Sequence, residues 1–174
     1  MKYIDIIKQS MDFLGTDNKT IFIGYNVKFG SMGNKTLTDI NKNQLIETPV
    51  AENLMMGLCI GMALEGYKPI IYFERFDFIL NALDSIVNHL DKFKNISNNE
   101  YNPKVIIRVV QGNKINPLYT GDTHTQDFTE ALKNLVSFNV VKLTDKNKIL
   151  ETYKNAYYSN MSSVIIEEKD LYNT

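Results

Sequence analysis

The chain has 174 residues, 44% of them hydrophobic and 22% charged, which suits one globular domain with a sizeable core. Its formal net charge of -1 leaves no basic excess to meet phosphates, so nucleic-acid binding is not expected. No secretory signal and no run of about 18 apolar residues is visible, and the single cysteine, Cys59, cannot form an intramolecular disulfide. We therefore expect a cytoplasmic protein that does not enter a membrane.

The first third of the chain predicts a helix, a strand and a long loop. Apolar residues recur at gaps of three and four over residues 3–14, which predicts an amphipathic helix. Residues 20–24 form a short apolar run that is typical of a buried strand. Residues 25–47 are rich in Gly, Asn, Lys and Thr and predict a loop with room for one short helix. Loops of this length in a compact domain are usually functional or disordered.

The next predicted helix begins at Thr48-Pro49 and runs to about Leu64. Thr is a good N-cap and Pro suits the first helical position. Glu52 lies in the first turn, where an acid favours the positive end of the helix dipole. The helix also carries small residues, whose repeated use indicates close packing against a neighbouring element: Gly57, Gly61 and Ala63.

Strands and helices alternate through the rest of the chain. The predicted strands cover 68–73, 105–110, 139–143 and 164–167, and the predicted helices cover 76–92, 129–135 and 146–158, with a polar loop at 95–102. This order predicts an α/β three-layer sandwich with a mainly parallel sheet flanked by helices, in one domain over 1–174. Because ligands bind beyond the carboxyl ends of such strands, we expect a site among 24–48, 73–77 and 111–126.

Residues taken singly leave the function open. No glycine-rich phosphate-binding motif, no nucleophile elbow and no metal-ligand cluster is present. His124 lies in a polar segment and could move protons near neutral pH, although an ordinary surface histidine has the same pattern. Glu52 precedes the apolar run 54–60, so we expect it to be buried and to need a partner.

A family resemblance becomes visible once the motifs are taken together. The segments 48–53, 66–69, 76–79, 84–88 and 124–126, with Leu171-Tyr172 near the end, resemble in order and spacing the beta subunit of pyruvate and branched-chain 2-oxo acid dehydrogenases. The similarity runs from about Ile21 to Tyr172. The wider group includes transketolase and deoxyxylulose-phosphate synthase, which all use thiamine diphosphate.

The resemblance implies a role for each of four residues. Glu52 matches the glutamate that hydrogen-bonds the pyrimidine ring of thiamine diphosphate and so favours the imino tautomer, whose nitrogen takes the proton from the thiazolium carbon. Phe78 matches the aromatic that stacks on the aminopyrimidine, although a core aromatic would look the same. Glu74 matches a position whose backbone contacts the amino group. His124 matches a histidine that hydrogen-bonds the substrate or an intermediate.

The same resemblance implies a missing half. Family enzymes hold the diphosphate through Mg²⁺ in a second domain with a Gly-Asp-Gly motif, but here only Gly121-Asp122-Thr123 occurs. We expect no diphosphate-binding domain and no C-terminal transketolase domain in this chain, and no metal site. The family's acidic pair after the first strand is Tyr25-Asn26 here, and its Gly-rich stretch is changed over 113–117. These changes leave the substrate and the usual acyl-transfer partner open.

The first functional hypothesis is an enzyme subunit that is inactive without its partner. It would share thiamine diphosphate with a separate subunit that binds diphosphate and Mg²⁺, as a homodimer core within an α2β2 heterotetramer, and would act on a 2-oxo acid by decarboxylation with acyl or aldehyde transfer. One alternative is a split transketolase-type subunit that acts on a ketose, or a decarboxylase subunit for sugar or sulfonated substrates. Another alternative is a non-catalytic assembly or regulatory module that retained the fold.

Overall fold

Six parallel strands form a single sheet in the computed structural model, which describes residues 1–30, 35–117, 119 and 121–174. The strands are β1 (Thr20–Gly24), β2 (Leu45–Glu47), β3 (Lys68–Phe73), β4 (Ile106–Gln111), β5 (Asn139–Leu143) and β6 (Ser163–Glu168). Their order across the sheet is β2-β1-β3-β4-β6-β5, and every neighbouring pair is parallel. The predicted α/β class is confirmed.

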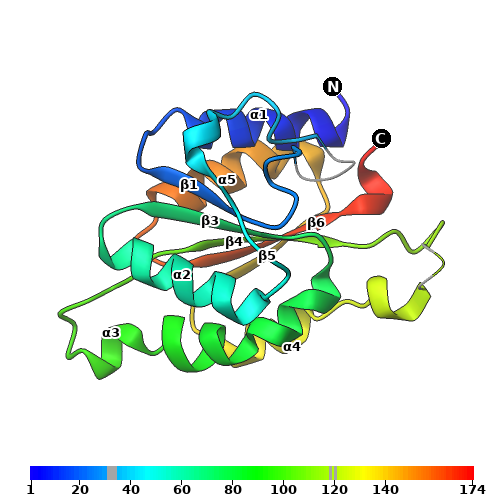
Figure 1. The fold of residues 1–174 in the computed structure, drawn as a ribbon. Coiled ribbons are helices and arrows are strands. Elements are labelled where there is room, and N and C mark those ends of the chain that lie inside the picture. The colour runs from blue at the N-terminus through cyan, green and yellow to red at the C-terminus, as the bar shows by residue number, and fades with distance from the viewer. Residues whose placement is uncertain (31–34, 118, 120) are drawn as a thin grey trace.

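Helices cover both faces of the sheet (Figure 1). The helices α1 (Tyr3–Gly15) and α5 (Ile149–Tyr158) lie on one face, and α2 (Glu52–Leu64) and α4 (Thr129–Leu135) lie on the other. Strand residues alternate between the two cores: Ile71 and Phe73 pack toward α2, whereas Ile70 and Tyr72 pack toward α1. These two cores make the three layers that the sequence predicts.

The structure differs from the expected elements at three places. The segment expected as one helix over 76–92 is a 3₁₀ helix (Phe76–Ala82) followed by a π-helical turn (Ser85–Leu90). The short helix α3 (Phe93–Ile96) continues it into the segment expected as a polar loop. The loop expected over 25–47 contains a 3₁₀ turn (Lys42–Gln44) and the short edge strand β2, while residues 31–34 of this loop lie outside the described residues.

The predicted start of α2 is also wrong. The helix begins at Glu52 with Ala51 as its N-cap, and no side chain caps it. Thr48 instead donates its backbone N–H to the carbonyl oxygen of Gly24 at 3.1 Å, which continues the pairing of β2 with β1. Because this backbone bond requires an extended chain, Thr48 and Pro49 precede the helix rather than open it. Glu52 consequently becomes the first helical residue.

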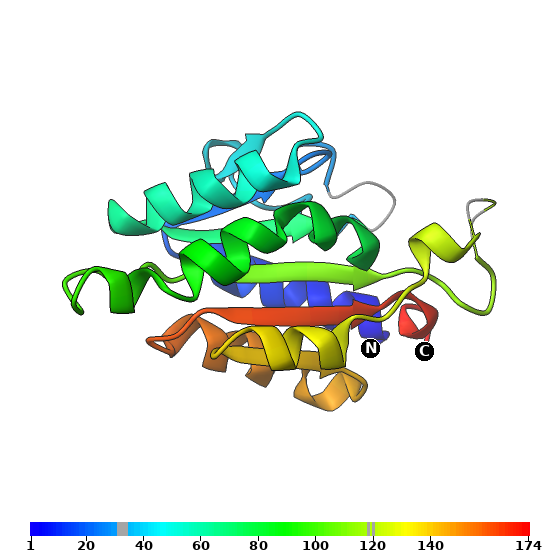
Figure 2. The same cartoon turned by 90° about the horizontal axis from the view of Figure 1, so that it is seen from below.

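Both chain ends and the segment after β4 lie toward the carboxyl edge of the sheet (Figure 2). The backbone N–H of Tyr3 donates to the carbonyl oxygen of Thr174 at 3.0 Å, and the Tyr3 hydroxyl accepts from the N–H of Glu168. None of the helices in the described parts of the chain is long and apolar enough to cross a membrane.

Candidate functional site

The four residues singled out in the sequence follow β2, β3 and β4 at the carboxyl edge of the sheet. Glu52 begins α2, and Glu74 comes directly after β3. Phe78 lies in the 3₁₀ helix that follows, and His124 ends a 3₁₀ turn (Gly121–His124) beyond β4. This edge is where parallel sheets bind ligands. The fold thus gathers the predicted residues at one edge of the sheet.

Glu52 is a buried carboxylate, with 5% of its surface exposed. Its Oε2 accepts a hydrogen bond from Nδ2 of Asn81 at 3.3 Å. No hydrogen bond among the described residues reaches Oε1. The first-turn position also places the carboxylate beside the unpaired N–H groups and positive dipole end of α2. One oxygen is therefore fixed by the protein and the other remains able to meet a ligand.

Tyr25 joins Glu52 to the aromatic side chains of the site. Burial raises the pKa of the Tyr25 hydroxyl well above its ordinary value, and the nearby negative charges of Glu74 and Glu52 raise it further. The phenol therefore stays neutral. Its ring centroid lies 6.5 Å from that of Phe78, at an interplanar angle of 47°.

Phe78 also contacts His124. The two ring centroids are 5.2 Å apart and the rings are nearly perpendicular, at 87°, which is a favourable edge-to-face arrangement. The Thr123 hydroxyl lies 3.0 Å from Nδ1 of His124. The aromatic cluster thus extends from Tyr25 through Phe78 to His124.

A glycine makes the position of His124 possible. A Cβ atom built on Gly112 would lie 1.7 Å from the carbonyl oxygen of His124 and 2.9 Å from its carbonyl carbon. Only a residue without a side chain allows the two backbones to approach this closely. Gly112 comes directly after β4, so the strand end itself positions the histidine segment.

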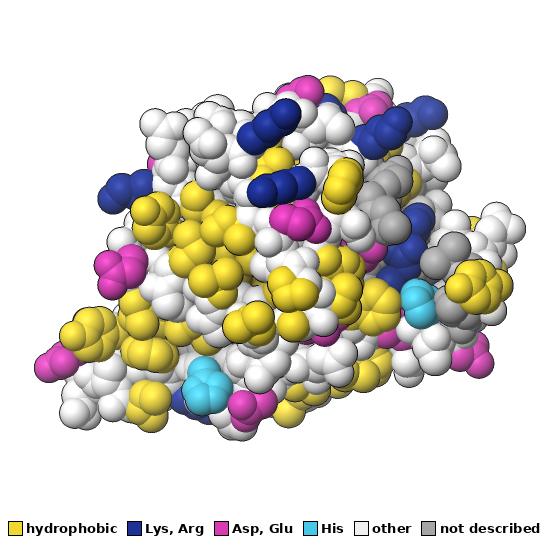
Figure 3. All heavy atoms as spheres, viewed as in Figure 1, with side chains coloured by type: hydrophobic (Ala, Val, Ile, Leu, Met, Phe, Trp, Pro, Cys, Tyr) yellow, Lys and Arg dark blue, Asp and Glu magenta, His cyan; other side chains and the backbone are white. Residues whose placement is uncertain are grey.

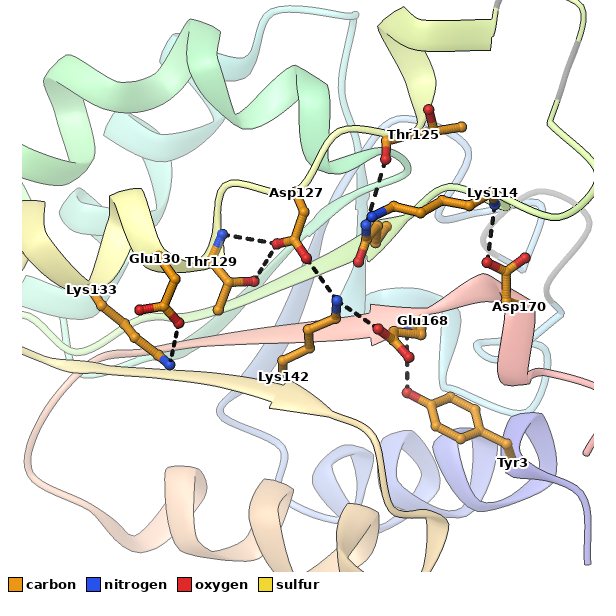
Figure 4. A network of polar contacts seen from close by, with 11 residues as sticks. Tyr3, Lys114, Thr125, Asp127, Thr129, Glu130, Lys133, Lys142, Glu168 and Asp170 are labelled. Carbon is orange, nitrogen blue, oxygen red and sulfur yellow. Dashed lines mark hydrogen bonds and ion pairs between the residues drawn. The ribbon is translucent and has the colours of Figure 1, made fainter.

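Polar contacts hold the residues that follow His124. Nε2 of Gln126 donates to Oδ1 of the buried Asp77 at 2.9 Å, which ties this segment to the helix that carries Phe78. Asp127 accepts from Lys142 at 2.7 Å, and Lys142 also contacts Glu168 at 2.6 Å (Figure 4). The histidine segment is thereby anchored to β5 and β6 as well as to β4.

Two carboxylates, Glu47 and Glu74, lie near Tyr25-Asn26, the position where the family has an acidic pair. Glu47, at the end of β2, accepts the backbone N–H groups of Asn26 at 2.5 Å and Lys28 at 2.9 Å. Burial raises the pKa of Glu74, while Arg75 and a hydrogen bond from Asn26 oppose that rise. Acidic groups therefore remain around Tyr25-Asn26, although they come from β2 and β3.

The comparisons with known proteins define the family of this chain. The model of the transketolase pyrimidine-binding domain matches residues 1–174, and the chain belongs to that family. Its sequence is 26% identical over 147 residues to the 2-oxoisovalerate dehydrogenase subunit beta of Bacillus subtilis, which covers 81% of this chain and 44% of that protein. It is 32% identical over 93 residues to the mitochondrial pyruvate dehydrogenase E1 component subunit beta of Saccharomyces cerevisiae, which covers 53% of this chain and 25% of that protein.

Solved structures show the same fold. A split-gene transketolase, described as an inactive beta4 tetramer, matches with a TM-score of 0.73 at 16% identity, covering 97% of this chain and 52% of that chain. The transketolase of Campylobacter jejuni matches with a TM-score of 0.75 at 12% identity, covering 94% of this chain and 25% of that one. The chain thus spans about half or less of the length of these relatives.

Sequence reasoning missed four side chains near the predicted residues. In the sequence Tyr25 is only a departure from the family's acidic pattern, yet its ring packs on Phe78. Asn81 gave no signal, because its contact with Glu52 depends on the 3₁₀ geometry of its segment. Arg75 and Lys169 follow β3 and β6, and the rule that sites lie beyond strand ends could have drawn attention to both.

Proposed function

We propose that this chain is the pyrimidine-domain subunit of a cytoplasmic, two-component thiamine-diphosphate enzyme that decarboxylates a 2-oxo acid with acyl or aldehyde transfer. The buried carboxylate of Glu52 carries the proposal. It begins α2 with Oε2 held by Asn81, while Oε1 makes no hydrogen bond within the described residues. The sequence relatives named above are beta subunits of 2-oxo acid dehydrogenases, which supports this substrate class.

The site residues suit an aminopyrimidine ring. Glu52 Oε1 would share a proton with a ring nitrogen, and Phe78, between Tyr25 and His124, offers an aromatic face. The backbone of Glu74, directly after β3, would accept from the amino group. When bound, thiamine diphosphate supplies an acidic thiazolium carbon that becomes the nucleophile toward a carbonyl. His124 would hydrogen-bond the reacting substrate.

A partner subunit would supply the diphosphate and Mg²⁺ site. The described residues contain no group of three or more His, Cys, Asp or Glu side chains placed to hold a metal ion. We propose that Mg²⁺ is held by a separate subunit with the diphosphate-binding domain, as the resemblance to two-domain family enzymes implies. This chain would be inactive without it.

The outer face of α2 supports such assembly. Hydrophobic side chains gather over α2 and the helical segment after β3 (Figure 3), including the exposed Leu54, Leu58 and Leu80. A Cβ atom added at Gly57 or Gly61 would meet nothing within 4 Å, so both glycines leave open surface. Two glycines four residues apart, Gly57 and Gly61, within an apolar helix surface suit close helix packing. We propose that this surface of α2 pairs two copies of this chain within an α2β2 heterotetramer.

The decisive experiment replaces Glu52 in the complete enzyme. The tagged chain is purified with its partner, supplied with Mg²⁺ and thiamine diphosphate, and assayed with pyruvate and a branched-chain 2-oxo acid. Glu52→Gln should lower kcat at least about a hundredfold, because proton transfer to the cofactor loses its carboxylate. Glu65→Gln, at the exposed far end of the same helix, is the matched control and should retain full activity.

The same assay separates the other functions. Turnover of a ketose phosphate but of no 2-oxo acid would replace the proposal with the split transketolase-type function, for which the split-gene transketolase offers a structural precedent of the same fold. If neither substrate is turned over, and Glu52→Gln leaves partner binding unchanged, the chain is a non-catalytic assembly module.

A further inference from the structure

A small basic pocket has His124 in its wall. Its lining residues are polar or charged: Arg75, Asn113, Asn116, His124, Thr125 and Lys169. Arg75 follows β3, Asn113 follows β4 and Lys169 follows β6. These three strands are neighbours in the sheet, so the pocket occupies the middle of its carboxyl edge.

Two cations in this pocket lack an ion-pair partner within the described parts of the chain. Nη1 of Arg75 donates to the backbone carbonyl of Glu74 at 2.5 Å, which satisfies a donor without neutralising the charge. Burial lowers the pKa of Lys169, and the neighbouring positive charge of Arg75 lowers it further, whereas Glu74 opposes both effects. Two like charges held together at partial burial are unfavourable unless an anion binds between them.

The other nearby carboxylates have different partners. Glu168 lies 2.6 Å from Lys142 on β5. Asp170 accepts the backbone N–H groups of Lys114 at 3.0 Å and Ile115 at 3.4 Å, as Figure 4 shows for Lys114. Glu74 interacts electrostatically with both cations, and burial raises the pKa of its own carboxyl group. The described residues that line the pocket include these two cationic side chains and no carboxylate.

We propose that Arg75 and Lys169 bind a second anionic group of the substrate, distant from the carbonyl that reacts. This inference rests on the proposed function and narrows its substrate class to a 2-oxo acid with a further carboxylate, phosphate or sulfonate. The His124 ring connects the pocket to Phe78 through their edge-to-face contact. A substrate whose carbonyl lies near His124 can thus extend its anionic end toward the two cations. An arginine and a lysine together suit the several oxygens of such a group.

The test uses the full chain alone and three probe anions: inorganic phosphate, succinate and methanesulfonate. Each is titrated while the backbone amide signals of Gly112, Asn113 and Thr125 are followed by NMR. Saturable shifts of these amides are expected for at least one anion, and the tightest binder identifies the group. Arg75→Gln and Lys169→Gln should each weaken its binding about tenfold, since each removes one charge-assisted hydrogen bond.

Lys114→Gln is the matched control, because Lys114 is an exposed lysine of the same segment that does not line the pocket. It should bind the anion as tightly as the natural chain. The proposal is overturned if none of the three anions gives saturable shifts, or if Arg75→Gln and Lys169→Gln bind like Lys114→Gln. This titration contains neither cofactor nor partner, so it measures anion affinity independently of turnover. A failed turnover assay and a failed anion site can therefore be distinguished.

Discussion

Side chains beyond the catalytic candidates hold the segment that follows His124, and Asp127 is one of them. Burial opposes its ionisation, but hydrogen bonds from Lys142 and Thr129 lower the pKa of Asp127 from 3.8 to about 2. Its side chain is 30% exposed, so solvent screens part of this interaction. We estimate its contribution to the free energy of unfolding at about 1–2 kcal/mol.

This contribution should depend on pH. A carboxyl group whose pKa is lowered by folding stabilises the protein above its unfolded pKa near 3.8, and the effect is lost as the pH falls through about 2. Asp127→Asn should therefore lower the free energy of unfolding by about 1 kcal/mol at pH 7 and by progressively less below pH 4. Urea unfolding at pH 7 and pH 3 measures both values. Asp122→Asn, an exposed aspartate of the same segment, is the control, and an equal loss at both pH values would contradict the assignment.

At the scale of one element, α2 has a buried side and an exposed apolar side. The buried side packs Met55, Met56 and Cys59 against the sheet, and the exposed side carries Gly57, Gly61 and several leucines. Glycine inside a helix costs about 0.5–1 kcal/mol relative to alanine. The isolated chain gains nothing visible from Gly61, because no atom lies within 4 Å of an added Cβ.

Gly61→Ala should consequently have opposite effects on the chain and on the assembly. In the isolated chain it should raise the free energy of unfolding by about 0.5–1 kcal/mol, measured by urea unfolding. In the purified complex the added methyl group should weaken association, measured by sedimentation. Asn155→Ala, exposed on α5 in the opposite layer, should leave assembly intact. Unchanged association of Gly61→Ala would remove α2 from the interface.

The sequence predicted elements best where local pattern and tertiary role agree. The apolar strand runs and the amphipathic α1 needed no further information, because burial on the sheet follows directly from the pattern. The edge strand β2 is only three residues long and has one neighbour, so it left no periodic signal. The nearly helical apolar spacing after β3 predicts one helix, whereas the segment forms a 3₁₀ helix and a π-helical turn whose apolar side chains share a core with α2.

The whole molecule is joined by a buried polar cluster between the sheet and the α1–α5 layer. Arg108 of β4 donates to Glu167 of β6 from Nε at 2.6 Å and from Nη2 at 3.1 Å. Tyr153 of α5 and Tyr172 near the chain end donate to the same carboxylate at 2.7 and 2.8 Å. Side chains from β4, α5, β6 and the segment that follows β6 thus meet at one buried charge pair.

Breaking this pair should destabilise the entire domain. Glu167→Ala leaves Arg108 buried without its counter-charge and should cost about 3–5 kcal/mol in the free energy of unfolding. The double variant Arg108→Met with Glu167→Leu removes both charges and should recover most of that loss. Tyr172→Phe, which deletes one hydrogen bond, should cost about 1.5–3 kcal/mol. Urea unfolding measures each value, and a loss below about 1 kcal/mol for Glu167→Ala would show that the cluster is dispensable.

For the whole molecule, the sequence predicts the class of fold but not the contacts between distant segments. The alternation of strands and helices fixed the layers, and the ordered motifs gave the family. The pairing of Arg108 with Glu167 joins residues 59 positions apart on the neighbouring strands β4 and β6. The approach of Gly112 to His124 joins residues 12 positions apart within the segment that follows β4. Spacing along the chain carries no signal for either contact, because the first depends on the strand order and the second on the path of that segment.

The backbone hydrogen bond between Tyr3 and Thr174 holds the two ends of the chain close together, which bears on proteins fused to either end. Both ends leave the fold near the carboxyl edge of the sheet, because the Tyr3 hydroxyl also meets β6 at Glu168. A diphosphate-binding domain tethered to either end by a short flexible linker would be held near the site at millimolar effective concentration. If the proposed two-subunit enzyme is correct, fusion at either terminus would make the association of the two subunits independent of concentration without altering any contact between them.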